Sequence, residues 1–426
     1  MNKWHSESFG DLTINFDSVR IPVKEADRQS GPYPYYGASG VVDYTDNFLF
    51  DGEYLLIAED GENLRTRNTP IAFIVNGKFW VNNHAHIVTG NDNADTRFLL
   101  YALLSLDISS YLTGSTMPKL TQGNLNNISL LVPPLPEQRR IAHVLGTLDD
   151  KIENNRKTAK TLEAMAQAIF KSWFVDFDTV RAKMAGESPE SICKRLKLTP
   201  EILDLFPDRL VDSELGEIPD GWVISSFLDV CDLKGGAQPP ASTFVDEPLE
   251  GYVRLLQIRD FSTDSHMTYI KDSSRLKYVT EDDILIGRYG SASGDKQKDS
   301  LGRVCRGLSG AYNVALMKLE PKSIGSEFAY QVVSSSSFYD YLQGASSKAV
   351  QAGFSKSEIA NLQIVLPPRK ILDHYELLGI IFWAETKLIS KYQNNLSKIR
   401  DTLLPKLISG EIRVPEAEHL IENMEG

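Results

Sequence analysis

Two stretches of the chain carry apolar residues at a regular spacing, in alternating steps of four and three residues. In the first stretch these positions are Ile141, Leu145, Leu148, Ile152, Asn155, Ala159, Leu162, Ala166, Ile169 and Trp173. In the second they are Ile371, Tyr375, Leu378, Phe382, Glu385, Ile389, Tyr392, Leu396, Ile399 and Leu403. A 3.5-residue repeat sustained over this length is the pattern of a coiled-coil seam. We therefore expect long helices over 136–175 and 368–412.

The two helices are expected to pair with each other. A helix of about 38 residues is ~57 Å long, whereas a globule of about 130 residues has a radius of gyration of only ~14 Å. Each helix must therefore project beyond its own globule, and antiparallel pairing follows if the globules are related by a pseudo-twofold axis. The alternative is that each helix only covers its own globule. The residues expected to pair are Leu145, Leu148, Ile152, Asn155, Leu162, Leu378, Phe382, Glu385, Ile389 and Leu396.

Both helices have a polar residue at the fifth seam position, Asn155 in the first and Glu385 in the second. A polar seam residue often fixes the register and the partner of a coiled coil at a cost in stability.

The segments before the helices predict two globules of mixed helix and strand. Short β-branched and apolar runs, bounded by Gly, Asn, Asp or Pro, read as strands at 54–58, 71–77, 79–83 and 128–132, and 96–112 reads as an amphipathic helix. The second globule repeats this mixture, with a helix at 326–342. There is no regular alternation of strand and helix, so the fold class is α+β.

The two globules are copies of one another in sequence order. EYLLIAEDG (53–61) recurs as DDILIGRYG (282–290), and LNNISLLVPP (125–134) recurs as IANLQIVLPP (359–368). Trp4, Phe9 and Asp11 recur as Trp222, Phe227 and Asp229. The domains are therefore placed at 1–135 and 222–367, with a mostly solvated linker over 176–221 and an acidic tail over 413–426.

Composition narrows the class of protein without identifying it. The 426 residues carry a formal net charge of −12, and the three cysteines, Cys193, Cys231 and Cys305, form no CxxC pair. No apolar run approaches the ~20 residues of a membrane span, and the N-terminus lacks the apolar core of a signal peptide. We expect a cytoplasmic protein without membrane attachment. The charge argues against a uniformly basic DNA coat but leaves room for local basic patches.

Motifs of catalysis are absent from the sequence. The three Pro-Pro pairs are not preceded by Asn or Asp, as adenine methylation would need, and no P-loop, GxSxG or HExxH occurs. Glu385-Thr386-Lys387 fits a nuclease fragment but lies in a helical pattern. His84 and His86 could share one face of a strand, but with no third ligand in range a structural role is favoured over a metal site. We expect no catalytic residue, no metal and no cofactor in this chain.

The whole chain resembles the specificity subunit of Type I restriction–modification systems. The resemblance rests on YPYYGASGVVDY (33–44), GEYLLIAEDG (52–61), LVPPLPEQRRIAHVLGTLDDKI (131–152), FKSWFVDFDTVRAKMAGE (170–187), LGEIPDGW (215–222) and LLPKLISGEIRV (403–414). The resemblance implies that each globule is a target recognition domain reading one half of a split double-stranded DNA site. It implies that the antiparallel helices set the distance between the halves. Because the insertions between the copies are unequal, the site should be asymmetric.

The resemblance also implies partners. Two methyltransferase (modification) subunits, which bind S-adenosylmethionine, would dock on this chain, and restriction/translocase subunits that use ATP and Mg would join them. The chain itself would be a non-catalytic recognition subunit. Two other readings stay open, namely a coiled-coil scaffold whose globules bind protein and a self-contained modification enzyme.

Polar side chains in loops of each globule are the candidates for DNA contact, since Arg and Lys suit phosphate or guanine, and Gln and Asn suit adenine. In the first globule they are Thr116, Lys119, Gln122 and Asn124, with Arg65 and Arg67 as a second choice. In the second globule they are Arg254, Arg259, Arg288, Ser347, Lys348 and Gln351, with the flexible basic stretch 287–298 beside them.

Overall fold

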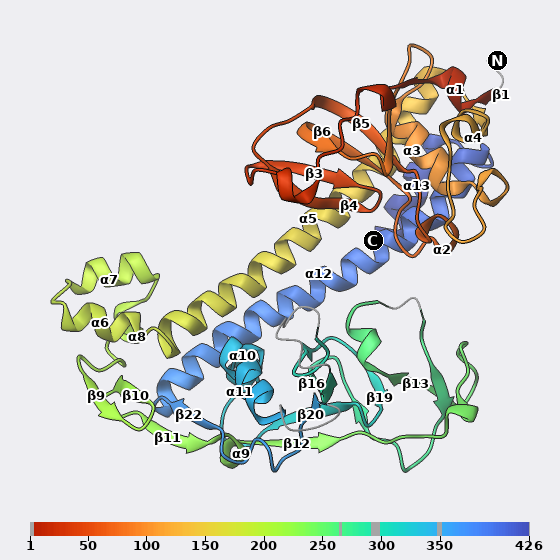
Figure 1. Ribbon diagram of the computed structural model, residues 1–426. Coiled ribbons are helices and arrows are strands. Elements are labelled where there is room, and N and C mark those ends of the chain that lie inside the picture. Colours follow the sequence, from red (N-terminus) through yellow and green to blue (C-terminus); the bar gives the residue numbers. More distant parts are fainter. Residues whose placement is uncertain (1–3, 264–265, 291–298, 347–351, 426) are drawn as a thin grey trace. The chain divides into compact units, whose positions relative to one another are not determined.

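The computed structural model describes residues 4–263, 266–290, 299–346 and 352–425. The chain divides into two compact units. The first unit comprises Met1–Arg156 and Ser390–Gly426, and the second comprises Lys157–Ile389. Two long helices, α5 (Leu135–Phe174) and α12 (Arg369–Ser409), contribute residues to both units (Figure 1). Among the described residues, no helix combines the length and apolarity that a membrane span requires.

The first unit is built around a six-stranded sheet of order β2-β7-β5-β6-β3-β4, with a separate antiparallel pair β1-β8. Its elements before α5 are β1 (His5–Ser8), α1 (Phe9–Leu12), β2 (Thr13–Asn15), β3 (Tyr33–Gly37), β4 (Gly40–Thr45), β5 (Phe50–Ala58), α2 (Asn63–Thr66), β6 (Ala72–Val81), β7 (Ala85–Gly90), α3 (Thr96–Ser105), α4 (Gln122–Asn126) and β8 (Ser129–Val132).

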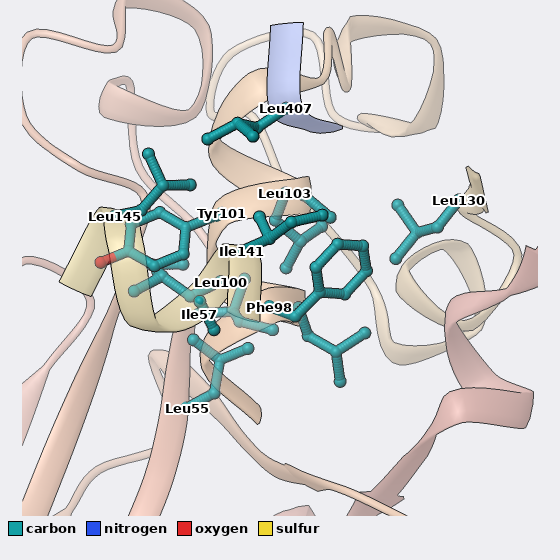
Figure 2. Close-up of a cluster of buried hydrophobic side chains, with 14 of the residues drawn as sticks. Leu55, Ile57, Phe98, Leu100, Tyr101, Leu103, Leu130, Ile141, Leu145 and Leu407 are labelled. Carbon is teal, nitrogen blue, oxygen red and sulfur yellow. The ribbon is translucent and has the colours of Figure 1, made fainter. Parts of the chain in front are cut away.

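Alternation along β5 separates the two faces of this sheet. Leu55 and Ile57 enter the core that also contains α3, whereas Leu56 between them enters a smaller cluster on the other face. Successive residues of a strand point to opposite faces, so a continuous apolar run indicates a strand that is buried on both sides. Figure 2 shows the larger core, in which Phe98 and Leu103 of α3 lie among side chains from β5, β8 and the long helices.

The second unit contains two four-stranded sheets, of order β12-β20-β16-β18 and β14-β13-β19-β15, and the pairs β11-β22, β10-β9 and β17-β21. Its elements are α6 (Asp178–Met184), α7 (Pro189–Leu196), α8 (Pro200–Leu203), β9 (Leu210–Ser213), β10 (Gly216–Pro219), β11 (Val223–Ser226), α9 (Phe227–Val230), β12 (Cys231–Gly235), β13 (Tyr252–Leu256), β14 (Tyr269–Lys271), β15 (Tyr278–Val279), β16 (Ile284–Gly287), β17 (Tyr289–Gly290), β18 (Val304–Cys305), β19 (Gly310–Tyr312), β20 (Leu316–Pro321), α10 (Ser326–Ser334), α11 (Ser336–Ser346), β21 (Ala352–Gly353) and β22 (Gln363–Leu366).

The sequence repeat is also a repeat of structure. In the first unit β1 pairs with β8 and runs into the one-turn helix α1. In the second unit β11 pairs with β22 and runs into α9. The sheet order β2-β7-β5-β6 has its counterpart in β12-β20-β16-β18. The α+β class and the duplicated domain are therefore confirmed.

The long helices run side by side and antiparallel within the first unit. Glu137 near the start of α5 pairs with Arg413 just beyond α12 (2.6 Å), and Asp149 further along α5 pairs with Arg400 of α12 (2.8 Å). The predicted seam residues Leu145, Leu148 and Leu396 are buried in one cluster with Ile399 and Leu403. That cluster also contains the core of the first recognition domain, so the helix seam and the domain share a single core.

Within the second unit, α5 and α12 meet through aromatic side chains. The Tyr375 hydroxyl donates to the carbonyl oxygen of Ala166 (3.3 Å), and its ring lies 5.1 Å from that of Phe174. Both helices are therefore part of the core of each unit, which contradicts the alternative that each covers only its own globule.

Seam positions nearer the middle of each helix are less buried. Ile152 packs against the first core and Leu378 against the second. Asn155, Leu162, Phe382 and Ile389 are half-buried, while Glu385 is exposed. The expectation of a polar residue inside the seam is therefore wrong for Glu385, because a carboxylate without a partner is more stable in water than in an apolar seam.

Two predicted connecting segments are folded. The linker over 176–221 forms α6, α7, α8 and the pair β9-β10, and it buries Phe177, Val180, Ile192 and Phe206 in the second core. The predicted acidic tail forms α13 (Val414–Glu425), whose Val414 and Ala417 are buried in the first core. Most residues of 176–221 are nevertheless exposed or half-exposed. A few apolar residues at helical spacing suffice to anchor such short polar helices.

Candidate nucleic-acid interface

A closed loop at residues 113–121 carries Thr116 and Lys119, and Gln122 and Asn124 follow it in α4. These are the side chains predicted to contact DNA in the first domain. Thr113 and Lys119 exchange two backbone hydrogen bonds (2.8 and 2.7 Å), and the Gly61 amide donates to the carbonyl oxygen of Pro118 (3.1 Å). Gly114 has φ of +86°, and a Cβ there would lie 2.2 Å from the carbonyl oxygen of Met117. Glycine permits this tight turn, so the loop is closed at its base and attached to the chain that leaves β5.

Three of the four predicted side chains, two in the loop and one at the start of the following helix, are exposed to solvent. Thr116 is exposed at the turn, and Gln122 is exposed at the first position of α4. Lys119 is half exposed and its Nζ lies 3.2 Å from Glu59 Oε1. Asn124 is different, because its amide donates to the carbonyl oxygen of Tyr111 (2.8 Å) and so helps to hold the loop.

The structure brings Arg65 to the same loop and assigns Arg67 to the interior of the domain. Arg65 Nη2 donates to the carbonyl oxygen of Gly114 (2.9 Å) and its side chain stays largely exposed. Arg67 has φ of +49° and donates to the carbonyl oxygens of Leu104 and Leu106 (3.1 and 2.6 Å). Burial lowers the pKa of Arg67 from its ordinary value. Its guanidinium therefore ties α2 to the end of α3.

In the second domain the three arginines predicted to contact DNA each make a hydrogen bond inside the domain. Arg254 pairs with the buried Asp260 (2.8 Å), and Arg259 donates to the Thr268 hydroxyl. Arg288 Nε donates to the carbonyl oxygen of Phe354 (3.0 Å). Ser347, Lys348 and Gln351, together with residues 291–298 of the basic stretch, lie outside the described residues.

A buried polar network next to the first loop was not predicted as a unit. His86 is 1 % exposed, and its Nδ1 lies 2.5 Å from Asp17 Oδ2. Arg20 donates to Glu59 Oε2 (2.9 Å), and the other oxygen of Glu59 faces Lys119. The sequence hints at this buried network only by placing charged residues within or beside apolar runs. That placement does not reveal which charged side chains pair with each other.

The histidine pair and the nuclease-like fragment are both structural. His84 precedes β7 and pairs with Asp60 (2.9 Å), whereas His86 points into the domain. Lys387 pairs with Asp282, to which Trp383 also donates (2.8 Å), and Glu385 lies within helix α12. Across the part of the chain that the structure describes, no three His, Cys, Asp or Glu side chains form a metal-binding group.

A cavity of about 620 Å³ lies in the first unit between β6, α3 and α5. Leu100, Leu104 and Ile152 contribute apolar surface, and Arg97 and Glu153 contribute charge. In the second unit, α12 has an exposed apolar face instead, formed by Leu377, Ile380, Ile381 and Leu388. Of these, Leu377 is 59 % and Leu388 is 62 % exposed.

The fold and its repeated domain match known proteins. Residues 1–164 match the model of the Type I restriction modification DNA specificity domain. A putative type I restriction enzyme specificity subunit of Haemophilus influenzae is 40% identical over 132 residues, which are 31% of this chain and 34% of that protein. The HindI specificity subunit of the same organism is 24% identical over 97% of this chain and 100% of its own length. The crystal structure of an S subunit from M. genitalium superposes with a TM-score of 0.57 at 16% identity, covering 95% of this chain and 96% of that one.

These matches define a two-domain α+β protein with long helices. Over 97% of its length the chain is similar to a Type I restriction enzyme specificity subunit, and the model of the DNA specificity domain matches residues 1–164. The match to the first Haemophilus influenzae relative spans about a third of that protein's length.

Proposed function

We propose that this chain is the DNA-recognition subunit of a Type I restriction–modification complex and reads a bipartite, asymmetric site. The observation that carries the proposal is the duplicated domain, in which corresponding segments differ in sequence between the copies. These segments read GSTMPKL (114–120) in the first domain and ASSKAVQAGF (345–354) in the second. Loops on a repeated scaffold can diverge without loss of the fold, so each domain can read a different half-site.

Direct reading of bases needs polar side chains that reach the groove edges. In the first domain, Thr116, Lys119, Gln122 and Arg65 all belong to or contact one loop, so a single approach to the duplex would engage them together. In the second domain, the corresponding contacts are proposed for the loop that contains Ser347, Lys348 and Gln351. Arg254 and Arg259 are proposed as outlying contacts to phosphate.

The exposed apolar face of α12 supports the scaffolding part of the proposal. Four large apolar side chains within twelve residues of one helix are unusual for a face that stays in water. We propose that this face, or the long helices generally, receives a methyltransferase subunit, with the restriction/translocase subunits joining through it. Catalysis, S-adenosylmethionine, ATP and Mg would then belong to the partners, and this chain would be non-catalytic.

The decisive experiment is a domain exchange in the assembled complex. The chain is expressed with its methyltransferase subunit, and methylated adenines are mapped by sequencing host DNA. Replacing residues 222–367 by the corresponding domain of a relative with a different target should change one half of the methylated site and leave the other half intact. Unchanged sites, or changes in both halves, would contradict the proposal. Methylation by this chain alone would favour the self-contained enzyme.

A paired test addresses the scaffold. Leu377→Ser with Ile381→Ser should weaken co-purification of the methyltransferase subunit, whereas His374→Ser, an exposed change on the same helix, should not. Equal recovery of the partner with both variants would place its docking site elsewhere.

A further inference from the structure

The loops proposed to read DNA end at equivalent residues in the two domains. The repeat that aligns 125–134 with 359–368 also aligns Leu120 with Phe354, and both side chains are buried. The Leu120 amide donates to the carbonyl oxygen of Glu59 (2.8 Å), and the Phe354 amide donates to that of Arg288 (3.2 Å). Glu59 and Arg288 are themselves equivalent in the aligned segments 53–61 and 282–290. The backbone therefore attaches the two loops in the same way.

The carbonyl group of the same loop residue receives a side-chain donor in both domains, but from different places. In the first domain His86 Nε2 donates to the carbonyl oxygen of Leu120 (2.8 Å). In the second domain Arg288 Nε donates to the carbonyl oxygen of Phe354 (3.0 Å). In the second domain, the counterpart of His86 by strand register is Met317 of β20, a buried apolar residue that has no such donor. A different side chain therefore satisfies the equivalent carbonyl group in each domain. This indicates that the hydrogen bond to this residue matters, whichever side chain donates it.

Both ring nitrogens of His86 face oxygen acceptors. Nδ1 lies 2.5 Å from Asp17 Oδ2 and Nε2 lies 2.8 Å from the carbonyl oxygen of Leu120. An imidazole donates from both nitrogens only when it is protonated on both. Asp17 is held in place by the Ile87 amide (2.9 Å) and lies 3.5 Å from Arg20, while Glu59 Oε2 is 4.0 Å from His86 Nδ1. Lys119 completes the charged groups around the ring through its contact with Glu59.

We infer that His86 and Asp17 are positioning residues that set the conformation of the first DNA-reading loop, through the hydrogen bond from His86 to the carbonyl oxygen of Leu120. This inference rests on the proposed function of that loop.

The test uses the complex of the full chain with its methyltransferase subunit. Fluorescence anisotropy measures affinity for the mapped site and for duplexes altered in one half-site at a time. His86→Met, which installs the residue of the second domain, should lower discrimination at the first half-site about tenfold. Discrimination at the second half-site should stay unchanged and serves as the internal control.

His86→Gln keeps a side-chain donor and serves if His86→Met does not assemble. It should reduce discrimination at the first half-site less than His86→Met does. Wild-type discrimination at both half-sites that neither His86 variant changes would overturn the inference and leave the proposed function intact. A wild-type complex that discriminates at neither half-site would instead overturn the proposed function.

Discussion

The two recognition domains share a backbone plan but are fastened to the long helices by different side chains. In the first domain, the Tyr101 hydroxyl of α3 donates to Asp149 of α5 (2.6 Å), and Arg400 of α12 pairs with the other oxygen of that carboxylate (2.8 Å). Burial, and then the charge of Asp149, raises the pKa of Tyr101 well above its ordinary range. Next to this contact lies the cavity lined by Leu100 and Glu153.

In the second domain the equivalent space holds an arginine. At the common offset of 230 positions, Leu100 corresponds to Tyr330 and Glu153 to Trp383. The Arg306 guanidinium lies between these two rings, 4.0 and 3.9 Å from their centroids, and bonds both carboxylate oxygens of Glu327 at 2.8 Å. The same junction therefore contains an open, partly polar cavity in one copy and a buried, stacked ion pair in the other.

The N-terminal caps of the equivalent helices α3 and α10 also differ between the two domains. In α3 the cap is local, because the Asp95 carboxylate accepts from the amides of Arg97 and Phe98. In α10 the preceding residue is Gly325, and Glu376 of α12 accepts from the Glu327 amide (3.0 Å). A Cβ at position 325 would lie 1.9 Å from Glu376, so the distant cap requires the glycine. Duplicated domains can thus keep one architecture while the residues that stabilise it move to other positions.

The largest effect is expected from Arg306→Ala. Removing the cation leaves Glu327 buried without its partner, which should cost about 3–5 kcal/mol. Hydrogen exchange read by mass spectrometry should show faster exchange in α10 and β18 and little change in α3. Arg306→Lys should lose less, and Arg275→Ala, an exposed change in the same domain, should be near neutral. Equal exchange in wild type and Arg306→Ala would show that the stacked pair does not hold this junction.

Asp149→Ala should have a smaller effect in the first domain. The Asp149 and Arg400 side chains are each about one-third exposed, so water compensates part of the loss. We expect about 1–2 kcal/mol, seen as faster exchange in α3 without change in α10. The adjacent exposed residue supplies the control, since Asp150→Ala removes the same charge without the two hydrogen bonds. A control variant as destabilised as Asp149→Ala would point to net charge as the cause.

Exchanging the caps should sharpen the comparison further. Glu376→Ala should destabilise α10 by about 1 kcal/mol, the usual value of an N-cap. Gly325→Asp alone should also destabilise, because its Cβ collides with Glu376. The double variant should recover exchange protection in α10, since the local cap then resembles that of Asp95. Additive losses in the double variant would mean that Glu376 acts by some route other than capping.

The smallest effect concerns pH and distinguishes the polar interior of the first domain from the apolar one of the second. Burial alone would raise the pKa of Asp17, but the hydrogen bond and charge of His86, the Ile87 amide and Arg20 together lower it below the ordinary value of 3.8. A depressed carboxyl pKa stabilises the fold at higher pH, and this contribution is lost as pH falls through the folded-state value.

Asp17→Asn should therefore flatten the acid side of the stability profile by at most about 1 kcal/mol. Calorimetric scans between pH 5 and pH 3 should show the smaller pH dependence in the unfolding transition of the first domain. That transition is recognised because Arg306→Ala, in the second domain, does not shift it. Parallel profiles for wild type and variant would show that Asp17 is not ionised through contacts specific to the folded state.

Local pattern predicted the elements well where the pattern was long or repeated. The 3.5-residue spacing predicted α5 and α12 to within a few residues of their observed ends, and the repeated strings predicted which strands correspond. The pattern did not predict the burial of Phe177, Ile192 and Phe206 within 176–221, because these residues are too widely spaced to show a period. It also failed at Glu385, because a heptad position does not reveal whether a side chain at that point is covered.

Candidate site residues were only partly predictable. The polar residues of loop 113–121 stand out because they form a short polar stretch between the predicted helix at 96–112 and the apolar run at 128–132. The roles of Arg67 and Arg288 could not be predicted, because the carbonyl groups to which they donate are 37 and 66 positions away in the chain.

The sequence by itself determined the duplication, the two long helices and the resemblance to a family, because periodicity and repetition are properties of the order of residues. Tertiary structure alone decided which charges are buried together, such as Arg306 with Glu327 and His86 with Asp17. Burying a charge is favourable only when a partner meets it at hydrogen-bonding distance. That partner comes from another strand or helix, so its identity depends on how the elements pack.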